Sequence, residues 1–421
     1  MKHIRTQLAL RKTFEYNLLM SISISTFFGF LLIVSVNNID LPILLEEIPI
    51  INRIDIPTNT NPIISNEVVD FNEKDYEETI VSLKEKGLYY YPALNKRLKS
   101  SFDLMYYGIL NNQTKIKFTE QLSVDELENL VYIIQFDCPE LFNISLTYNY
   151  DTKGGYVTAF YPDYKLSSVE YKSRLAILEQ KADKIIKEVT NKTEYEAELY
   201  IHDYILKNTV YDLEAKDNDD IYGCLINGKA NCKGYTSTYC YLLRKAGIES
   251  TTVIGEVNAN GKVTGHSWNL IKINGQYVYT DICWDDIAES QEYKDIDYHY
   301  AFLNMSYYEM INNRNIAKQL KYLGDIPKTK ESNSSYYKLE GLYANNYEEA
   351  KKIINNKLPI VLSSQEKKFV IQCNNEETYN ELINNITSIM KEMINDEKIS
   401  INSCKYSKID TGYTLIIHDF S

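Results

Sequence analysis

Three residues of this chain carry side chains that can together transfer an acyl group. Cys232 supplies a thiol, His266 an imidazole and Asp281 a carboxylate, in this order along the sequence. In such a set a thiolate attacks a carbonyl carbon, an imidazole moves the proton, and a carboxylate fixes the imidazole tautomer. The residue types and their order therefore predict a reaction class, cysteine-dependent acyl transfer, without naming a substrate.

The candidate nucleophile lies where a helix is expected to begin. Apolar residues follow Cys232 at helical spacing over residues 233–245, and Gly247 comes shortly after them as a C-terminal cap. A thiol in the first turn of a helix faces unpaired backbone amides and the positive end of the helix dipole, and both favour the thiolate. We therefore expect Cys232 to ionise more readily than an ordinary cysteine.

A predicted hairpin brings the other two residues together. Strands are expected at residues 250–257, 263–273 and 276–283, and the Asn274-Gly275 pair between the last two is typical of a two-residue hairpin turn. This register places His266 opposite Cys283 and makes Asp281 the diagonal neighbour of His266 on the same face. A loop one residue longer would move the carboxylate to the other face.

Taken together, these segments resemble the transglutaminase-like superfamily, whose core is similar to that of papain-type cysteine peptidases. The resemblance covers the middle third of the chain, and it is specific as a combination of short motifs. The matching segments, in chain order, are His202-Asp203-Tyr204-Ile205, Val210-Tyr211-Asp212, Cys232-Lys233-Gly234-Tyr235, His266-Ser267-Trp268-Asn269, Asp281 with Trp284-Asp285-Asp286, and Tyr300-Ala301-Phe302-Leu303-Asn304 as a closing strand.

The resemblance implies an α+β fold in which a nucleophile helix packs on an antiparallel sheet. By carry-over, Cys232 is the nucleophile, His266 the general base and acid, and Asp281 the orienting carboxylate. Animal members use a tryptophan upstream of the nucleophile to stabilise the oxyanion, but both tryptophans of this chain follow Cys232. The oxyanion donor is therefore unassigned, with the backbone amide of Cys232 as one contributor.

Two classes of function remain open at this point. The first is a thiol enzyme that forms a thioester on Cys232 with a peptide or amide, such as a cell-wall peptide, and passes the acyl group to water or to an amine. Hydrolysis is preferred over protein crosslinking because no feature marks an amine site. The second class is a non-catalytic cell-surface scaffold that binds peptides.

The remaining histidines and cysteines receive structural interpretations. His202 lies in a helix with a capping box at its start and is expected to be hydrogen-bonded and structural. His299 and His418 receive no role, and Cys283 is interpreted as a small apolar filler that could line the cleft. Seven cysteines and five histidines show no CxxC pair or ligand spacing, so neither a metal nor a cofactor is expected.

The N-terminal sequence predicts where the chemistry takes place. Basic residues lie among residues 1–12, and residues 18–36 carry no charge, which is typical of a single-pass anchor with a cytoplasmic N-terminus and an extracellular enzyme. A secreted protein with a cleaved signal peptide is the alternative. The net charge of −13 argues against nucleic acid as a partner, and seven irregularly spaced cysteines argue against a disulfide framework.

Five regions are expected along the chain. They are a cytoplasmic tail and transmembrane anchor (1–36), an extended linker (37–75), an accessory α+β region (76–165), the transglutaminase-like domain (166–325) and a C-terminal α+β domain (326–421). The accessory region is expected to hold a helix at 123–134 and a hairpin of strands 144–150 and 155–161, and a helix at 168–189 opens the next region. The C-terminal domain is expected to hold helices at 347–356 and 376–394 and strands at 359–362, 368–373, 398–406 and 413–418.

Overall fold

The computed structural model describes residues 72–259, 261–286, 299–317, 326–364 and 368–421. The expected membrane anchor at residues 18–36 and nearly all of the linker lie outside these ranges. Among the described helices, none combines the length and the apolar composition that a membrane crossing requires.

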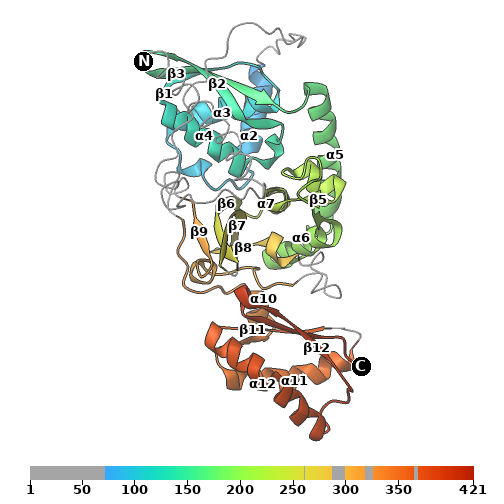
Figure 1. Cartoon of the computed structure of the whole chain (residues 1–421). Helices are drawn as coiled ribbons and strands as arrows, with labels where there is room; N and C mark the ends of the chain where they lie inside the picture. The colour runs from blue at the N-terminus through green and yellow to red at the C-terminus, as the bar shows by residue number, and fades with distance from the viewer. Residues whose placement is uncertain (1–71, 260, 287–298, 318–325, 365–367) are drawn as a thin grey trace, which may run out of the picture.

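Figure 1 shows the accessory region at one end of the molecule, the C-terminal unit at the other, and the helix-and-sheet core with the candidate residues between them. The accessory region places three helices beside an antiparallel sheet of order β1-β3-β2. Its elements are α2 (Glu73–Lys84), α3 (Lys96–Leu110), β1 (Ile116–Leu122), α4 (Val124–Asp137), β2 (Ile144–Lys153) and β3 (Tyr156–Tyr164). The expected helix and hairpin are both present.

The core combines helices with a four-stranded antiparallel sheet of order β8-β7-β6-β9. Its helices are α5 (Ser168–Lys187), α6 (Glu194–Asn208), α7 (Cys232–Lys245), α8 (Ile282–Asp285) and α9 (Tyr307–Met310). Its strands are the short parallel pair β4 (Val210–Tyr211) and β5 (Lys229–Ala230), then β6 (Ser250–Ala259), β7 (Lys262–Ile273), β8 (Gln276–Thr280) and β9 (Arg314–Ile316).

Local sequence explains where the key elements begin and turn. Asn231 caps α7, and capping boxes start α4 and α6. Asn274 and Gly275 both have positive φ, 51° and 80°, as a tight hairpin turn of primed type requires. The predicted register is confirmed over the paired residues, because β7 and β8 pair from Ile273 opposite Gln276 to Asn269 opposite Thr280. The predicted pair of His266 and Cys283 is wrong, because Cys283 lies in α8.

Two expected strands are wrong in part or in whole. The strand expected at residues 276–283 ends at Thr280, and residues 282–285 form the short helix α8 with Asp281 as its N-cap. The side chain of Asp281 accepts a hydrogen bond from the Trp284 amide, which turns the chain out of the sheet. Residues 300–304 form turns, and only Met305 makes an isolated bridge, to Tyr279.

The core sheet is covered on both faces. Ile271, Ile273 and Val278 face α7, which confirms the expected packing of the nucleophile helix on an antiparallel sheet. Trp268 and Tyr279, on the other face, belong to one hydrophobic cluster with residues of the accessory region. The accessory region therefore supplies part of the hydrophobic core beneath the sheet.

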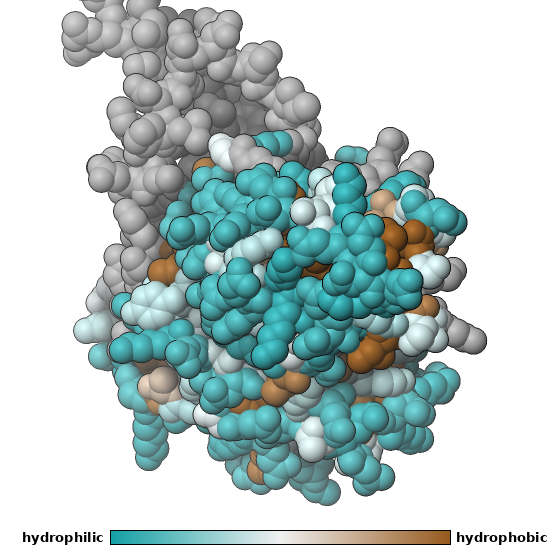
Figure 2. All heavy atoms as spheres, turned by 90° about the horizontal axis from the view of Figure 1, so that it is seen from below, coloured by the Kyte–Doolittle hydropathy of each residue, from teal (hydrophilic) through white to brown (hydrophobic). Residues whose placement is uncertain are grey.

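The C-terminal unit has a separate hydrophobic cluster between two helices and a sheet of order β10-β11-β13-β12. Its elements are α10 (Tyr336–Leu339), β10 (Tyr343–Ala344), α11 (Tyr347–Ser363), β11 (Lys368–Cys373), α12 (Glu376–Asn395), β12 (Lys405–Ile409) and β13 (Thr414–His418). The strand expected at 359–362 is wrong because α11 continues through Pro359, and the strand expected at 398–406 begins only at Lys405. Hydrophilic residues cover most of the face that is seen from below in Figure 2.

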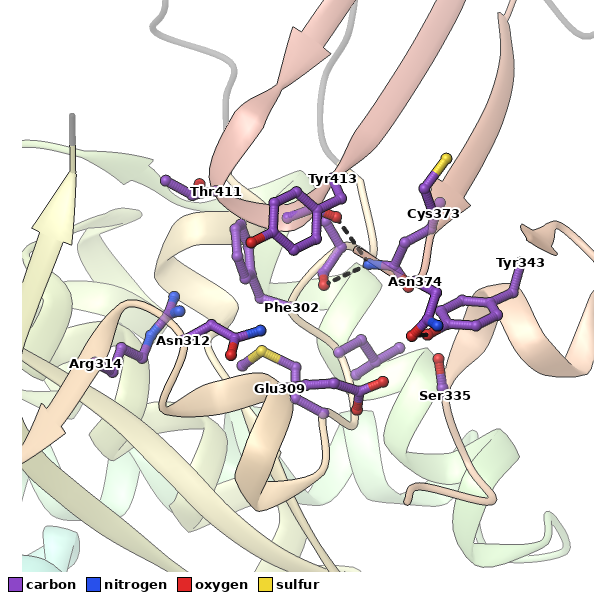
Figure 3. A pocket seen from close by; sticks show the side chains of 15 residues that line it. Phe302, Glu309, Asn312, Arg314, Ser335, Tyr343, Cys373, Asn374, Thr411 and Tyr413 are labelled. Atoms are coloured by element: carbon purple, nitrogen blue, oxygen red, sulfur yellow. Dashed lines mark hydrogen bonds between the residues drawn. The ribbon is translucent and has the colours of Figure 1, made fainter. Parts of the chain in front are cut away.

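The C-terminal unit contacts the core at the segment that follows α8. Gln372 donates a hydrogen bond to the Ala301 carbonyl at 3.1 Å, and the Tyr337 hydroxyl accepts one from the Tyr300 amide at 3.2 Å. A Cβ atom on Gly412 would lie 3.0 Å from the Ala301 side chain, so a larger residue there would force a small shift at this contact. Figure 3 shows this junction, with Phe302 and Arg314 on its core side.

Candidate functional site

The turn before α7 sets the position of Cys232. The Asn231 side chain accepts hydrogen bonds from the amides of Lys233 (2.9 Å) and Gly234 (3.2 Å), and the Asn231 amide donates to the Asn218 carbonyl. A Cβ atom on Gly234 would lie 2.3 Å from that same carbonyl, so only glycine fits. Cys232 is thereby held in the first turn, with 7% of its surface exposed.

His266 connects Cys232 to Asp281. Its Nε2 atom lies 2.8 Å and 3.0 Å from the two carboxylate oxygens of Asp281, and because a carboxylate only accepts, Nε2 carries the hydrogen. The ring also lies close enough to the Cys232 thiol for each group to shift the pKa of the other. The structure thus joins His266 to Asp281 by hydrogen bonds and places Cys232 beside the imidazole.

The pKa values of these groups favour an ion pair between thiolate and imidazolium. Burial opposes ionisation of Cys232, but the hydrogen bond and charge of His266, with a hydrogen bond from Ser267, bring the thiol pKa below its ordinary value. Burial likewise opposes protonation of His266, but the charge and hydrogen bond of Asp281 raise the imidazole pKa to about 9. Asp281 is buried, yet His266 and Arg314 keep the pKa of its carboxyl below the ordinary value.

The cysteines of the chain differ sharply in their electrostatic surroundings. Burial raises the thiol pKa of the other six cysteines, which are Cys138, Cys224, Cys240, Cys283, Cys373 and Cys404. Cys283 lies beside the site, where the charge of Cys232 adds to burial in raising its pKa. It is buried in the same apolar cluster as Cys232, as expected for an apolar filler. Cys232 alone has a lowered thiol pKa.

Aromatic rings and a second hydroxyl complete the surroundings of the imidazole and the thiol. The rings of Trp268 and Trp284 lie 6.3 Å and 5.7 Å from the His266 ring, centroid to centroid. They limit the access of water to the hydrogen bond between His266 and its carboxylate. The Ser267 hydroxyl contacts that of Thr236 at 3.2 Å, and Ser267 helps to lower the pKa of the Cys232 thiol.

Two residues at the site were missed by the sequence analysis. Arg314 places its Nε and Nη2 atoms 3.0 Å and 2.5 Å from Oδ2 of Asp281. Tyr211 was quoted only as part of a motif, but the charges of Cys283, Cys232 and Asp281 add to burial in raising its phenol pKa, so the phenol is within electrostatic range of the site. The strand β4, which pairs Tyr211 with Ala230, could have pointed to this position; a single arginine in a polar run offered no signal.

Two backbone or side-chain donors near the thiol remain available. Among the described residues, none forms a hydrogen bond with the Tyr211 hydroxyl, and none accepts from the Cys232 backbone amide. Groups of this kind can stabilise the negative oxygen of a tetrahedral intermediate.

The other histidines lie outside this chain of contacts. His202 is fully buried, and its Nε2 atom lies 3.1 Å from Oδ2 of Asp285, so the prediction of a hydrogen-bonded structural histidine is confirmed. His299 accepts a hydrogen bond from the Ala301 amide, and His418 contacts the Ser407 hydroxyl at 2.9 Å. Within the described ranges, no group of three or more His, Cys, Asp or Glu side chains is arranged to hold a metal ion.

The fold and the site together place a thiol at the start of a helix, beside an imidazole carried by an antiparallel sheet. Residues 179–282 match the model of the transglutaminase-like superfamily, from within α5 to just past Asp281. This chain therefore carries a transglutaminase-like domain that includes all three candidate residues. No curated protein matches the chain significantly.

Several solved structures share similarity with part of the chain. They include a transglutaminase ("TGase") at 15% identity and TM-score 0.23, with 40% of this chain and 50% of that chain covered. A proposed cysteine protease from Cytophaga hutchinsonii (14%, TM-score 0.23) covers 33% of this chain and 62% of its own. The periplasmic domain of TgpA from Pseudomonas aeruginosa, solved with ethylmercury (14%, TM-score 0.21), covers 31% and 60%. The present chain thus spans less than two thirds of each of these proteins.

Proposed function

We propose that this protein is a thiol-dependent acyl-transfer enzyme of the transglutaminase-like type. In this proposal Cys232 forms a thioester with a peptide or amide substrate, and water hydrolyses the thioester. One observation carries the proposal. Of the seven cysteines, only Cys232 has a lowered thiol pKa, and it is the cysteine that contacts an imidazole bonded to a buried carboxylate.

The reaction proceeds in two halves. The Cys232 thiolate attacks the substrate carbonyl carbon, the C–N bond breaks, and the His266 imidazolium gives its proton to the departing amine. Neutral His266 then takes a proton from water, which attacks the thioester and releases the carboxylic acid and the thiolate. Asp281 keeps the proton on Nε2 throughout, so that Nδ1 serves the reaction.

Two donors are proposed for the oxyanion. The Cys232 amide points out of the first turn of α7, and the Tyr211 hydroxyl lies near the same thiol. Together they could fill the role that a tryptophan upstream of the nucleophile plays in animal transglutaminases. A phenol whose pKa is raised keeps its hydrogen and remains a donor at neutral pH.

Limited exposure narrows the class of substrate. Cys232 and His266 expose 7% and 8% of their surfaces, so a slender group such as a glutamine side chain or an extended peptide must reach the thiol. Cell-wall peptides are the candidates if the uncharged segment at residues 18–36 anchors the protein with its catalytic part outside the cell. Hydrolysis is preferred because no amine site is evident near the thiol among the described residues.

The proposal is tested by trapping the acyl-enzyme. The purified protein is incubated with glutamine peptides and with muropeptides, and the mass added to the Cys232 peptide is measured before and after a chase with water or a primary amine. We expect a thioester on Cys232 that water removes, and an amine product instead would favour crosslinking. Cys232→Ala should abolish the adduct, and the matched control Cys283→Ala should keep it. Tyr211→Phe should slow acylation about 100-fold.

Two results would overturn the proposal. One is equal and slow alkylation of Cys232, Cys224 and Cys240 by iodoacetamide, which would favour a binding scaffold without catalysis. The other is an adduct that persists in the Cys232→Ala variant.

A further inference from the structure

We propose that Arg314 is a positioning residue for this reaction, which holds Asp281 in the orientation and ionised state that align His266 with the Cys232 thiol. This inference rests on the proposed function. Among the described residues, the hydrogen bonds of Arg314 at the site go to Asp281 and none goes to the thiol or the imidazole, so its action passes through Asp281.

The contacts divide the Asp281 carboxylate between two tasks. Oδ2 accepts from Nε and Nη2 of Arg314, and Oδ1 accepts from the Trp284 amide at 3.2 Å. Both oxygens lie within 3.0 Å of Nε2 of His266. Because the guanidinium fork and the helix cap fix the plane of the carboxylate, the imidazole meets an acceptor that does not rotate.

Arg314 is itself rigidly held. It is 1% exposed, and its guanidinium lies 4.5 Å from the Trp284 ring and 4.8 Å from the Phe302 ring. The third nitrogen, Nη1, donates to the Asn313 side chain at 2.6 Å. The backbone of Arg314 lies in β9, opposite Val257 of β6 in the core sheet. A long side chain fixed at every nitrogen loses little further freedom when it binds a carboxylate.

The charges alternate along the chain of contacts. Thiolate, imidazolium, carboxylate and guanidinium follow one another, so a buried site with two anions is balanced by two cations. The members come from α7 (Cys232), β7 (His266), the start of α8 (Asp281) and β9 (Arg314), and the titratable groups around them are Tyr211 from β4, Cys283 from α8 and the Asp286 carboxylate that acts on Cys283. Arg314 is the only fixed cation among them.

Removal of the cation should therefore change two separate properties. Asp281 without Arg314 would bind the imidazolium more strongly, which raises the pKa of His266, and the uncompensated negative charge would also raise the pKa of the thiol. Asp281 would also lose its fixed plane. The first effect shifts a pH profile, and the second lowers kcat without a comparable rise in KM.

The experiment compares Arg314→Met, Arg314→Lys and Arg244→Met. The rate of iodoacetamide labelling of Cys232 is followed by peptide mass spectrometry across pH, together with turnover of the donor found above. Arg244 is the matched control, since it is also buried, at 7% exposure, but donates to the Lys86 carbonyl instead of a carboxylate of the site. Circular dichroism verifies that each variant is folded.

We expect Arg314→Met to move the labelling profile up by about one pH unit and to lower kcat by about 100-fold. Arg314→Lys keeps the charge but not the fork, so its profile should stay near that of the unmodified protein while kcat still falls. Arg244→Met should leave the profile unchanged.

Three outcomes would overturn the inference. They are an unshifted profile in folded Arg314→Met, an equal shift in Arg314→Lys, or full kcat in Arg314→Lys; the last two can be read even if Arg314→Met does not fold. Failure of the proposed function is distinguishable, because Cys232 of the unmodified protein would then label slowly, with the pH dependence of an ordinary thiol.

Discussion

Two buried pairs of histidine and aspartate lie at opposite ends of the same short helix. Asp281 caps the start of α8 and bonds Nε2 of His266, while Asp285 ends α8 and bonds Nε2 of His202. In both pairs burial opposes protonation, yet the aspartates raise the imidazole pKa to about 9. A strong hydrogen bond to aspartate and a raised pKa therefore do not distinguish a reactive histidine from a structural one.

The difference lies at the second ring nitrogen. Nδ1 of His266 has no carboxylate partner, a thiol acts on the ring, and the residue keeps 8% exposure, whereas Nδ1 of His202 lies 3.4 Å from Asp203 and that residue has none. His202 thus joins two aspartates, and Asp203 extends the contact to the Tyr300 hydroxyl at 3.1 Å. We infer that the first pair serves the reaction and the second fastens α6 to α8.

Alanine at each histidine should separate the two roles most clearly. His266→Ala should lower kcat and the labelling rate of Cys232 by at least about 10³-fold, because the thiolate loses its partner, while Arg314 still pairs with the carboxylate of Asp281. His202→Ala should cost about 1.5–3 kcal/mol in the free energy of unfolding, because Asp285 loses a hydrogen bond to a charged partner, although Nδ1 of His299 still lies 2.9 Å from its other oxygen. Urea unfolding and Cys232 labelling rates of both variants test this division between reactivity and stability. A His202→Ala protein that is folded but unreactive would contradict it.

Asparagine at each aspartate provides a second, milder test. Asp281→Asn should lower kcat about 10²–10³-fold, because an amide neither fixes the tautomer nor stabilises the imidazolium. Asp285→Asn should leave turnover nearly unchanged and cost about 1.5–3 kcal/mol of stability, the range for a hydrogen bond to a charged group. Steady-state kinetics and denaturant titration distinguish the outcomes; similar kinetic losses in the two variants would remove the distinction.

The pH dependence gives the smallest effect and sharpens the comparison. Activity should decline as pH rises through about 9, where His266 loses its proton, and Cys232 should remain thiolate below the ordinary thiol range. Both imidazoles bind protons more tightly in the folded state than at their ordinary pKa of 6.5, so their stabilising contribution is complete below that pH and is lost as pH rises through about 9.

Comparing the unmodified protein with His202→Ala isolates the part of the pH-dependent stability that comes from His202 and Asp285. In His202→Ala the free energy of unfolding should fall less between pH 6.5 and about 9. The pH above which the Cys232 labelling profile changes should stay the same. A labelling limit that moves with His202 would show that the two pairs are coupled through α8.

The local sequence predicted the hairpin turn and the start of the nucleophile helix, because residues close in sequence determine both. The hairpin register follows from Asn274 and Gly275, and the start of α7 follows from a capping residue before Cys232. Alternation could not reveal that Asp281 leaves the strand to cap a helix, because that choice depends on its own hydrogen bond to the Trp284 amide. The contact between His266 and Asp281 survives this error.

Long-range contacts were beyond such rules. Arg314 reaches Asp281 from 33 residues further along the chain, on a strand that is short and polar in sequence. Pro359 normally ends a helix, but α11 continues past it, with the adjacent Leu358 fully buried. The membrane anchor remains a prediction, because residues 18–36 lie outside the part of the chain that the structure describes.

The shared hydrophobic cluster beneath the core sheet has a practical consequence for truncation. A fragment that begins at residue 166, the expected start of the catalytic domain, would expose Trp268, Leu270 and Tyr279 to water. Such a fragment would retain Cys232, His266 and Asp281 but would lack the accessory region that shields one face of the core sheet from water. The accessory region and the transglutaminase-like domain therefore share one hydrophobic core, and they should be expressed and studied as a single piece.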